Sequence, residues 1–184
     1  MAKPELTKQL IAQTLKKLML KNNLDKISVQ NIVDACGLNR KTFYYHFRDK
    51  QALVCWIFDN ESANLSDLNQ NNTIIDELLN YLYLNRDFYV AALTSDTQNN
   101  LREHLFKIVY ESIIVRIMEI LKNRSIDAYN MKLIANFFSN AIIGSITQWV
   151  KGGMKTFPKE YNIDLYLITQ ECLDFIVNRY VNEK

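Results

Sequence analysis

The stretch that decides the expected fold is SVQNIVDACGLNRKTFYYHFRDK, residues 28–50. Ser28 is a good N-cap for a short helix, and that helix should end at Gly37, because glycine most easily takes the left-handed conformation found after helices. Asn39 can cap a second short helix that continues through Phe47. Two short helices joined by a turn of about three residues have the layout of a helix-turn-helix.

Further helical patterns surround this motif. Apolar residues recur every three or four positions after Pro4, which predicts a helix over 4–21, and Asp49 can cap another helix directly after the motif. A polar, Asn-rich segment at 64–73 then marks a boundary or loop. Beyond it, helices are expected at about 73–85, 86–93, 99–122, 127–151 and 162–181, with loops at 94–98, 123–126 and 152–161.

The composition agrees with an all-helical globular protein. The 184 residues are 48% hydrophobic and 23% charged, which excludes a disordered or collagen-like chain. Only 4 Gly and 2 Pro are present, and a sheet protein with many tight turns would need more of these breakers.

Charge is distributed unevenly along the chain. The net charge is only +2, but residues 1–58 contain ten Lys or Arg and four Asp or Glu, whereas residues 59–184 contain twelve and sixteen. A surface that binds a polyanion is therefore expected at the N-terminal end.

Enzyme and metal chemistry find little support in the sequence. The cysteines Cys36, Cys55 and Cys172 are far apart and show no metal-ligand spacing, so we expect reduced thiols and no metal. Outside the helix-turn-helix, His104 is the one histidine left for acid–base work, and no nucleophile motif or phosphate-binding glycine loop is found. We expect no enzymatic activity and no cofactor.

The first residues lack the apolar core of a signal peptide, which favours the cytoplasm. Residues 133–150 carry no charge, but several polar residues interrupt them and the apolar positions fall on one face. A membrane span is therefore not expected.

The second short helix combines basic and aromatic side chains. A helix of this size enters the major groove of DNA, where Arg suits guanine O6 and N7 while Lys, Thr, Tyr and His can hold phosphate oxygens. Phe43 and Phe47 lie four residues apart, so one face can pack while the other contacts DNA. The alternative from charge and aromatics alone is an ordinary solvated surface with the tyrosines in the core.

Order and spacing favour DNA binding, because the segment resembles the DNA-binding domain of TetR-family transcriptional regulators. The residues that carry this resemblance, in order, are Gly37, Leu38, Thr42, Phe43, Tyr44, His46, Phe47, Lys50 and Leu53. The resemblance covers about residues 5–58. It implies an all-α fold of about nine helices: an N-terminal three-helix helix-turn-helix DNA-binding domain at 1–58, then a helical effector-binding and dimerisation domain at 59–184.

The same resemblance implies roles for individual residues. The side chains that would face bases are those of Gln30, Arg40, Lys41 and Tyr44, and those that would hold phosphates are Ser28, Thr42, Tyr45, His46 and Lys50. Val33 and Lys41 depart from the family pattern, which more often has small residues there. The extra cation at Lys41 means that the operator sequence cannot be inferred from better-known relatives.

The segment RKTFYYHFRDK, residues 40–50, also resembles the corresponding segment of a subgroup that includes regulators of dihydroxyacetone kinase genes. Some members of this subgroup are controlled by a partner protein and can activate transcription rather than repress it.

Two apolar stripes in the C-terminal half have two readings, intrachain core or subunit interface. In TetR-like proteins the last two long helices pair with their symmetry mates, so that two reading helices meet a palindromic operator on double-stranded DNA. The resemblance thus implies a homodimer whose interface includes Ile142, Ser145, Ile146, Trp149, Ile168, Cys172 and Phe175.

Aromatic residues are also abundant beyond Phe58, in the region that surrounds an effector cavity in the family. The candidate pocket residues are Tyr81, Phe88, Tyr89, Phe106, Tyr110, Phe137 and Phe138, although aromatic residues at helical spacing also commonly form plain core. The resemblance thus implies a homodimeric repressor released by an unknown small-molecule effector. The alternative is an activator controlled by a protein co-regulator that docks on the C-terminal domain.

Overall fold

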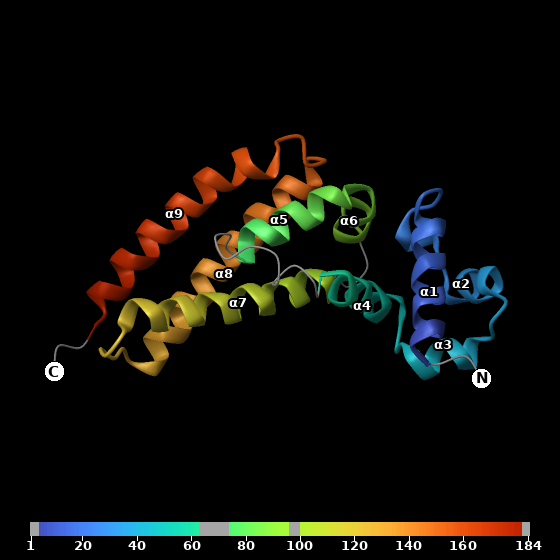
Figure 1. The fold of residues 1–184 in the computed structure, drawn as a ribbon, viewed down its shortest axis with the longest axis horizontal. Coiled ribbons are helices and arrows are strands. Elements are labelled where there is room, and N and C mark those ends of the chain that lie inside the picture. Colours follow the sequence, from blue (N-terminus) through green and yellow to red (C-terminus); the bar gives the residue numbers. More distant parts are fainter. Residues whose placement is uncertain (1–3, 63–73, 96–99, 182–184) are drawn as a thin grey trace. The chain divides into compact units, whose positions relative to one another are not determined.

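The computed structural model describes residues 4–62, 74–95 and 100–181, and it is helical through most of them (Figure 1). The α-helices are α1 (Pro4–Met19), α2 (Val29–Cys36), α3 (Arg40–His46), α4 (Lys50–Ser62), α5 (Ile74–Leu84), α6 (Arg86–Leu93), α7 (Asn100–Leu121), α8 (Ala128–Lys151) and α9 (Pro158–Arg179). This confirms the all-α prediction. Within the described ranges, no helix is long and apolar enough to cross a membrane.

Two features differ from the prediction by more than a residue or two. A short 3-10 helix, η1 (Leu24–Lys26), precedes α2. Helix α9 begins at Pro158, four residues before the predicted start. Pro158 falls within the predicted loop at 152–161, but proline is favourable in the first turn of a helix, where its missing N–H would have no partner.

The first of two compact units comprises residues 1–68 and 85–101. In it α1 packs against α2, α3, α4 and α6. Its core includes the fully buried side chains of Ile11, Leu15, Leu24, Ile32, Phe43, Leu53 and Ile57. Helix α6 belongs to this unit although it lies beyond residue 58 in the sequence. The predicted domain boundary at 58 and 59 stays a prediction.

The second unit comprises residues 69–84 and 102–184. Helix α9 packs against both α5 and α8. The apolar stripe of α8 lies in the core of this unit, with Ile134, Phe138, Ile142, Ile146 and Trp149 all buried.

Candidate nucleic-acid interface

Helix α2 has a well-defined start and end. Asn31 N–H donates to Ser28 Oγ at 3.1 Å, and Ser28 N–H donates to Asn31 Oδ1 at 2.8 Å, which is a reciprocal cap. At the other end Gly37 has a φ of 66°, and Leu38 N–H donates to Val33 O at 2.9 Å. The predicted cap at Ser28 and the left-handed glycine are both confirmed.

Helix α3 is anchored by its apolar face. Asn39 caps it, accepting a hydrogen bond from Thr42 N–H at 2.9 Å. Phe43 and Phe47 are buried, with ring centroids 5.9 Å apart, and Phe47 also contacts Trp56 of α4 edge-on at 5.7 Å. Because both phenylalanines point into the core, the opposite face of α3 is left for solvent or a ligand.

That opposite face carries a cation restrained by a tyrosine. The side chains of Arg40, Lys41 and Tyr44 are exposed. Arg40 Nη2 donates to Tyr44 Oη at 3.2 Å, and the guanidinium carbon lies 5.7 Å from the centroid of the same ring. The pair is spaced i and i+4, and it limits the directions that the guanidinium takes before any ligand arrives.

The residues predicted to hold phosphates lie beside this face. Tyr45 is 80% exposed, and its ring meets His46 edge-on at 4.9 Å. Thr42 is half-buried and its hydroxyl donates to Asn39 Oδ1 at 3.1 Å, while Ser28 Oγ donates to Asn31 Oδ1 at 2.7 Å. Both hydroxyls thus also take part in helix caps.

Gln30 on α2 is exposed, and its amide is already engaged. Gln30 Nε2 donates to Asp34 Oδ1 at 2.6 Å, one turn further along the helix. A base contact by Gln30 would have to share this amide or replace the bond. Sequence reasoning missed Asp34 as its partner, although the i and i+4 spacing was visible.

Asp49 and Lys50 form the start of α4. Ala52 N–H donates to Asp49 Oδ1 at 2.7 Å, which confirms the predicted cap. Burial alone would raise the pKa of Asp49, but the hydrogen bond from Ala52 and the neighbouring Arg48 outweigh it, so the pKa lies below its ordinary value.

Lys50 is half-buried. Its Nζ donates to three backbone carbonyl oxygens. These belong to Leu24, to Ile27 at 2.8 Å and to Asp25 at 3.4 Å. Burial lowers the pKa of its ammonium, with Asp25 opposing that effect. The structure thus gives this ammonium three acceptors within the protein. The phosphate contact predicted for Lys50 stays a prediction.

The predicted pocket aromatics are divided between the two units. Phe88 and Tyr89 lie in the first unit, where Tyr89 is fully buried and meets Phe58 edge-on at 6.1 Å. In the second unit Tyr81 and Phe138 are buried, whereas Phe137 is 68% exposed. The structure therefore does not bring these residues together within one unit.

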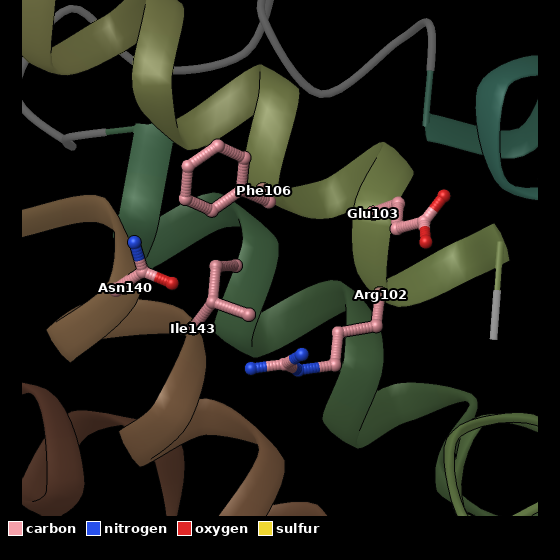
Figure 2. A pocket seen from close by; sticks show the side chains of 5 residues that line it. All are labelled: Arg102, Glu103, Phe106, Asn140 and Ile143. Carbon is pink, nitrogen blue, oxygen red and sulfur yellow. The ribbon is translucent and has the colours of Figure 1, made fainter. Parts of the chain in front are cut away.

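A pocket of about 210 Å³ lies in the second unit, between α7 and α8 (Figure 2). It is lined by Arg102, Glu103 and Phe106 from α7 and by Asn140 and Ile143 from α8. Of the predicted pocket residues only Phe106 lines it, and Phe106 stacks on Tyr110 with ring centroids 6.1 Å apart. The other lining residues were missed, because sequence periodicity does not reveal which turns of two distant helices face each other.

The predicted interface residues on α8 lie within the protomer. Ile142, Ile146 and Trp149 are buried. The ring of Trp149 stacks on Tyr161 of α9 at 5.2 Å, and its Nε1–H donates to Thr156 O at 3.0 Å. Burial raises the pKa of Tyr161, and a hydrogen bond with Ser145 opposes that effect. These contacts agree with the intrachain-core reading for α8.

The predicted interface residues on α9, unlike those on α8, are exposed to solvent. Ile168 and Phe175 are 63% and 65% exposed, and Cys172 is exposed between them. One side of α9 is therefore apolar and open in the protomer. The subunit interface itself stays a prediction.

No group of three His, Cys, Asp or Glu side chains among the described residues is placed to hold a metal ion.

Two family profiles match the chain. Residues 11–55 match the family described as bacterial regulatory proteins, tetR family, and residues 69–178 match one described as transcriptional regulator C-terminal region. The first match contains α2, α3 and the first residues of α4. The second spans more than half of the chain.

Individual proteins are also similar to this chain. The chain is 33% identical over 124 residues to the HTH-type dhaKLM operon transcriptional activator DhaS of Lactococcus lactis, which covers 64% of this chain and 64% of that protein. A solved structure described as the dihydroxyacetone kinase operon activator DhaS has a TM-score of 0.65 and 23% identity, covering 92% of this chain and 97% of the other. A TetR transcriptional regulator from Streptococcus agalactiae has a TM-score of 0.60 and 19% identity, covering 90% and 94%. These two structures show a shared fold.

Proposed function

The chain belongs to the TetR family of bacterial regulatory proteins, and from this premise we propose that it binds an operator on double-stranded DNA as a homodimer. The observation that carries the proposal is the division of α3 into two faces. Phe43 and Phe47 hold the helix in the core, while Arg40, Lys41 and Tyr44 stand exposed on the side that a major groove would meet.

The proposed contacts divide into two groups. Arg40, Lys41 and Tyr44, with Gln30 from α2, would face base edges and determine sequence preference. Ser28, Thr42, Tyr45 and His46 would contact phosphates and set the position of the protein on the duplex. We also place the protein in the bacterial cytoplasm, where its DNA target lies.

The proposed dimer uses the open side of α9. Ile168 and Phe175 are large apolar side chains that face solvent on one side of α9, and a contiguous exposed apolar patch is typical of a protein–protein interface. A second copy related by a two-fold axis would cover both and present two α3 helices to the two halves of a palindrome. The buried α8 residues would support this surface from within the protomer.

The test is fluorescence anisotropy of the purified protein against DNA from upstream of its own gene and a scrambled control, across a salt series. With six to eight phosphates held per dimer, log K should fall against log salt with a slope of roughly −5 to −7. A preference for the native fragment at about 150 mM salt supports the proposal. Equal binding to both fragments, lost as salt rises, contradicts operator recognition at that site.

The sign of regulation has two candidates. The sequence favours a repressor released by an effector, for which the pocket between α7 and α8 offers a binding place. The printed name of the Lactococcus lactis relative is that of a transcriptional activator, and this favours activation, with a protein co-regulator on the second unit. Transcription in vitro from the upstream fragment separates them, because added protein lowers transcript yield in the first case and raises it in the second.

A further inference from the structure

The pocket between α7 and α8 combines an apolar floor with a polar rim (Figure 2). The side chain of Ile143 is buried and that of Phe106 is half-buried, whereas Arg102, Glu103 and Asn140 are exposed. An apolar surface with a few polar groups around it is typical of sites that bind small organic molecules.

The volume of the pocket limits the size of such a molecule. The pocket measures about 210 Å³. An apolar cavity of about 150 Å³ is enough to hold benzene, whereas the pockets of drug-sized ligands measure roughly 300–1,000 Å³. The pocket between α7 and α8 therefore suits a single aromatic ring that carries one or two small polar groups.

The charge that faces the pocket is positive. Figure 2 shows the guanidinium of Arg102 extending from α7 toward α8, while the carboxylate of Glu103 points away from the other labelled side chains. Among the described residues that line the pocket, Arg102 is the only cation. A single guanidinium matches a carboxylate through two parallel hydrogen bonds, whereas phosphorylated ligands are generally bound by clusters of arginines. The pocket therefore favours a carboxylate.

Arg102 and Asn140 both have hydrogen-bonding capacity for a ligand. Arg102 already interacts within the protein, but a guanidinium has five N–H donors and can share them. Asn140 Nδ2 donates to Asn136 O at 2.8 Å, and Figure 2 shows the side-chain oxygen of Asn140 turned toward Ile143. Because an amide oxygen only accepts hydrogen bonds, it matches a hydroxyl group of the ligand.

We propose that the pocket between α7 and α8 binds a small aromatic hydroxycarboxylate, whose carboxylate pairs with Arg102, whose ring lies against Phe106 and Ile143, and whose hydroxyl donates to Asn140 Oδ1. Burial against Ile143 and contact with the Phe106 ring stabilise the bound ring. This ligand class is that of the effector in the proposed function. The effect of the ligand on DNA binding rests on that function, whereas its binding to the pocket does not.

The first experiment needs no DNA. The isotope-labelled full chain is titrated with para-hydroxybenzoate and with its neutral counterpart para-hydroxybenzamide, and binding is followed by the NMR shifts of the backbone amides. The proteins compared are the wild type, Arg102→Met and Lys107→Met. Methionine keeps an unbranched stem and removes the charge, and Lys107 is an exposed cation of the same helix that is not among the residues lining the pocket.

In the wild type, para-hydroxybenzoate should bind roughly tenfold more tightly than para-hydroxybenzamide, because hydrogen bonds between two charged groups are stronger than those to a neutral amide. The shifts should concentrate on the turns of α7 and α8 that line the pocket. Arg102→Met should remove the preference for the carboxylate, and Lys107→Met should keep it.

The hydroxyl is tested separately with benzoate, which lacks it. Benzoate should bind the wild type more weakly than para-hydroxybenzoate does. Asn140→Ala should weaken the binding of para-hydroxybenzoate to the level of benzoate and leave benzoate binding unchanged. Equal losses for the two ligands would overturn the placement of the hydroxyl at Asn140.

The last experiment adds the operator. Saturating para-hydroxybenzoate should change the operator affinity of the wild type by at least about fivefold, as is usual for coupled sites, and should leave that of Arg102→Met unchanged at the same concentration. An operator affinity that does not respond to the bound carboxylate overturns its role as effector.

Three results would overturn the ligand class. These are no binding of either carboxylate, an amide that binds as tightly as the carboxylate, and a carboxylate preference that survives in Arg102→Met. The comparison of carboxylate with amide in the wild type decides the charge preference even if Arg102→Met does not fold. If the wild type shows no preference for its own upstream DNA, the proposed function fails, while the titrations still decide whether the pocket binds a carboxylate.

Discussion

Arg40 and Tyr44 form a pair on the exposed face of α3, in which the guanidinium both donates to the phenol oxygen at 3.2 Å and lies over the ring. Each side chain is solvent-exposed, so the pair contributes little to the stability of the protein. Its importance lies in orienting Arg40, because an arginine that is already restrained loses less conformational entropy when it binds a base.

Replacing Arg40 should therefore affect specificity more than general affinity for DNA. Arg40→Ala is expected to weaken binding to the operator by about 1–3 kcal/mol and to relax the preference at the base pair it contacts. Anisotropy with the native operator and single-base variants measures both effects. Operator discrimination that persists unchanged in Arg40→Ala would show that another side chain reads the bases.

The pairing with Tyr44 predicts that the two substitutions are not additive. Tyr44→Ala and the double variant complete a cycle with Arg40→Ala, and the coupling in operator binding should exceed about 0.5 kcal/mol, as is usual for side chains in contact. Lys41→Ala combined with Tyr44→Ala is a useful control, since the structure shows Arg40 and not Lys41 on the tyrosine ring. A coupling near zero for Arg40 and Tyr44 would remove the orienting role of Tyr44.

Gly37 should tolerate asparagine better than alanine. Its φ of 66° is left-handed, and a Cβ added there meets nothing within 4 Å, so the cost of substitution is one of backbone conformation alone. Gly37→Ala is expected to lower the free energy of unfolding by about 1–2 kcal/mol, and Gly37→Asn by less, because asparagine enters the left-handed region more easily. Urea unfolding followed by circular dichroism compares the two, and equal losses would contradict this explanation.

The Asp49 cap predicts a specific pH dependence of stability. Because the folded-state pKa of Asp49 lies below its ordinary value of 3.8, the ionised carboxylate stabilises the folded state above that pH, and this contribution is lost as pH falls through the folded pKa. Asp49→Asn keeps an oxygen for the Ala52 N–H and removes only the charge. The stability difference between wild type and Asp49→Asn should be largest above about pH 4 and shrink on acidification, as measured by urea unfolding between pH 2 and 6. A difference that does not change with pH would contradict the assignment.

Charged substitutions on the open side of α9 should separate the proposed dimer. Phe175→Glu is expected to give a monomer at micromolar concentration in sedimentation velocity, because it places a charge on the apolar surface that the dimer would bury. Met118→Glu on α7 is the matched control, since Met118 is also exposed and lies outside the proposed interface. A wild-type protein that is already monomeric would remove the dimer and with it the palindrome argument.

Sequence reasoning succeeded where the signal is local. Ser28, Gly37, Asn39 and Asp49 were recognised as helix boundaries, because a cap depends on side chains within three or four residues of the helix end. The buried face of α3 followed in the same way from the spacing of Phe43 and Phe47.

Prediction from the sequence failed where a side chain's position depends on a contact with residues far away in the sequence. Lys50 reaches carbonyls 23 to 26 residues earlier, and a periodic pattern contains no information about such a pairing. The apolar stripe of α8 raised a different problem, because a buried core face and a subunit interface have the same spacing. The stacking of Trp149 on Tyr161 from α9, which only the fold reveals, places that face inside the protomer.

The inclusion of α6 in the first unit has a practical consequence for building chimeric regulators. The first unit is discontinuous in sequence. The contacts that join α6 and the nearby Ser95 to the N-terminal segments include Lys16 over the ring of Phe88, Phe58 against Tyr89, and the hydroxyl of Ser95 on the carboxylate of Asp25. A transplant that exchanges only residues 1–58 would leave α6 of the recipient against a foreign α1 and α4. A functional exchange of operator specificity should instead carry residues 85–95 together with the N-terminal helices, or be limited to the exposed residues of α2 and α3.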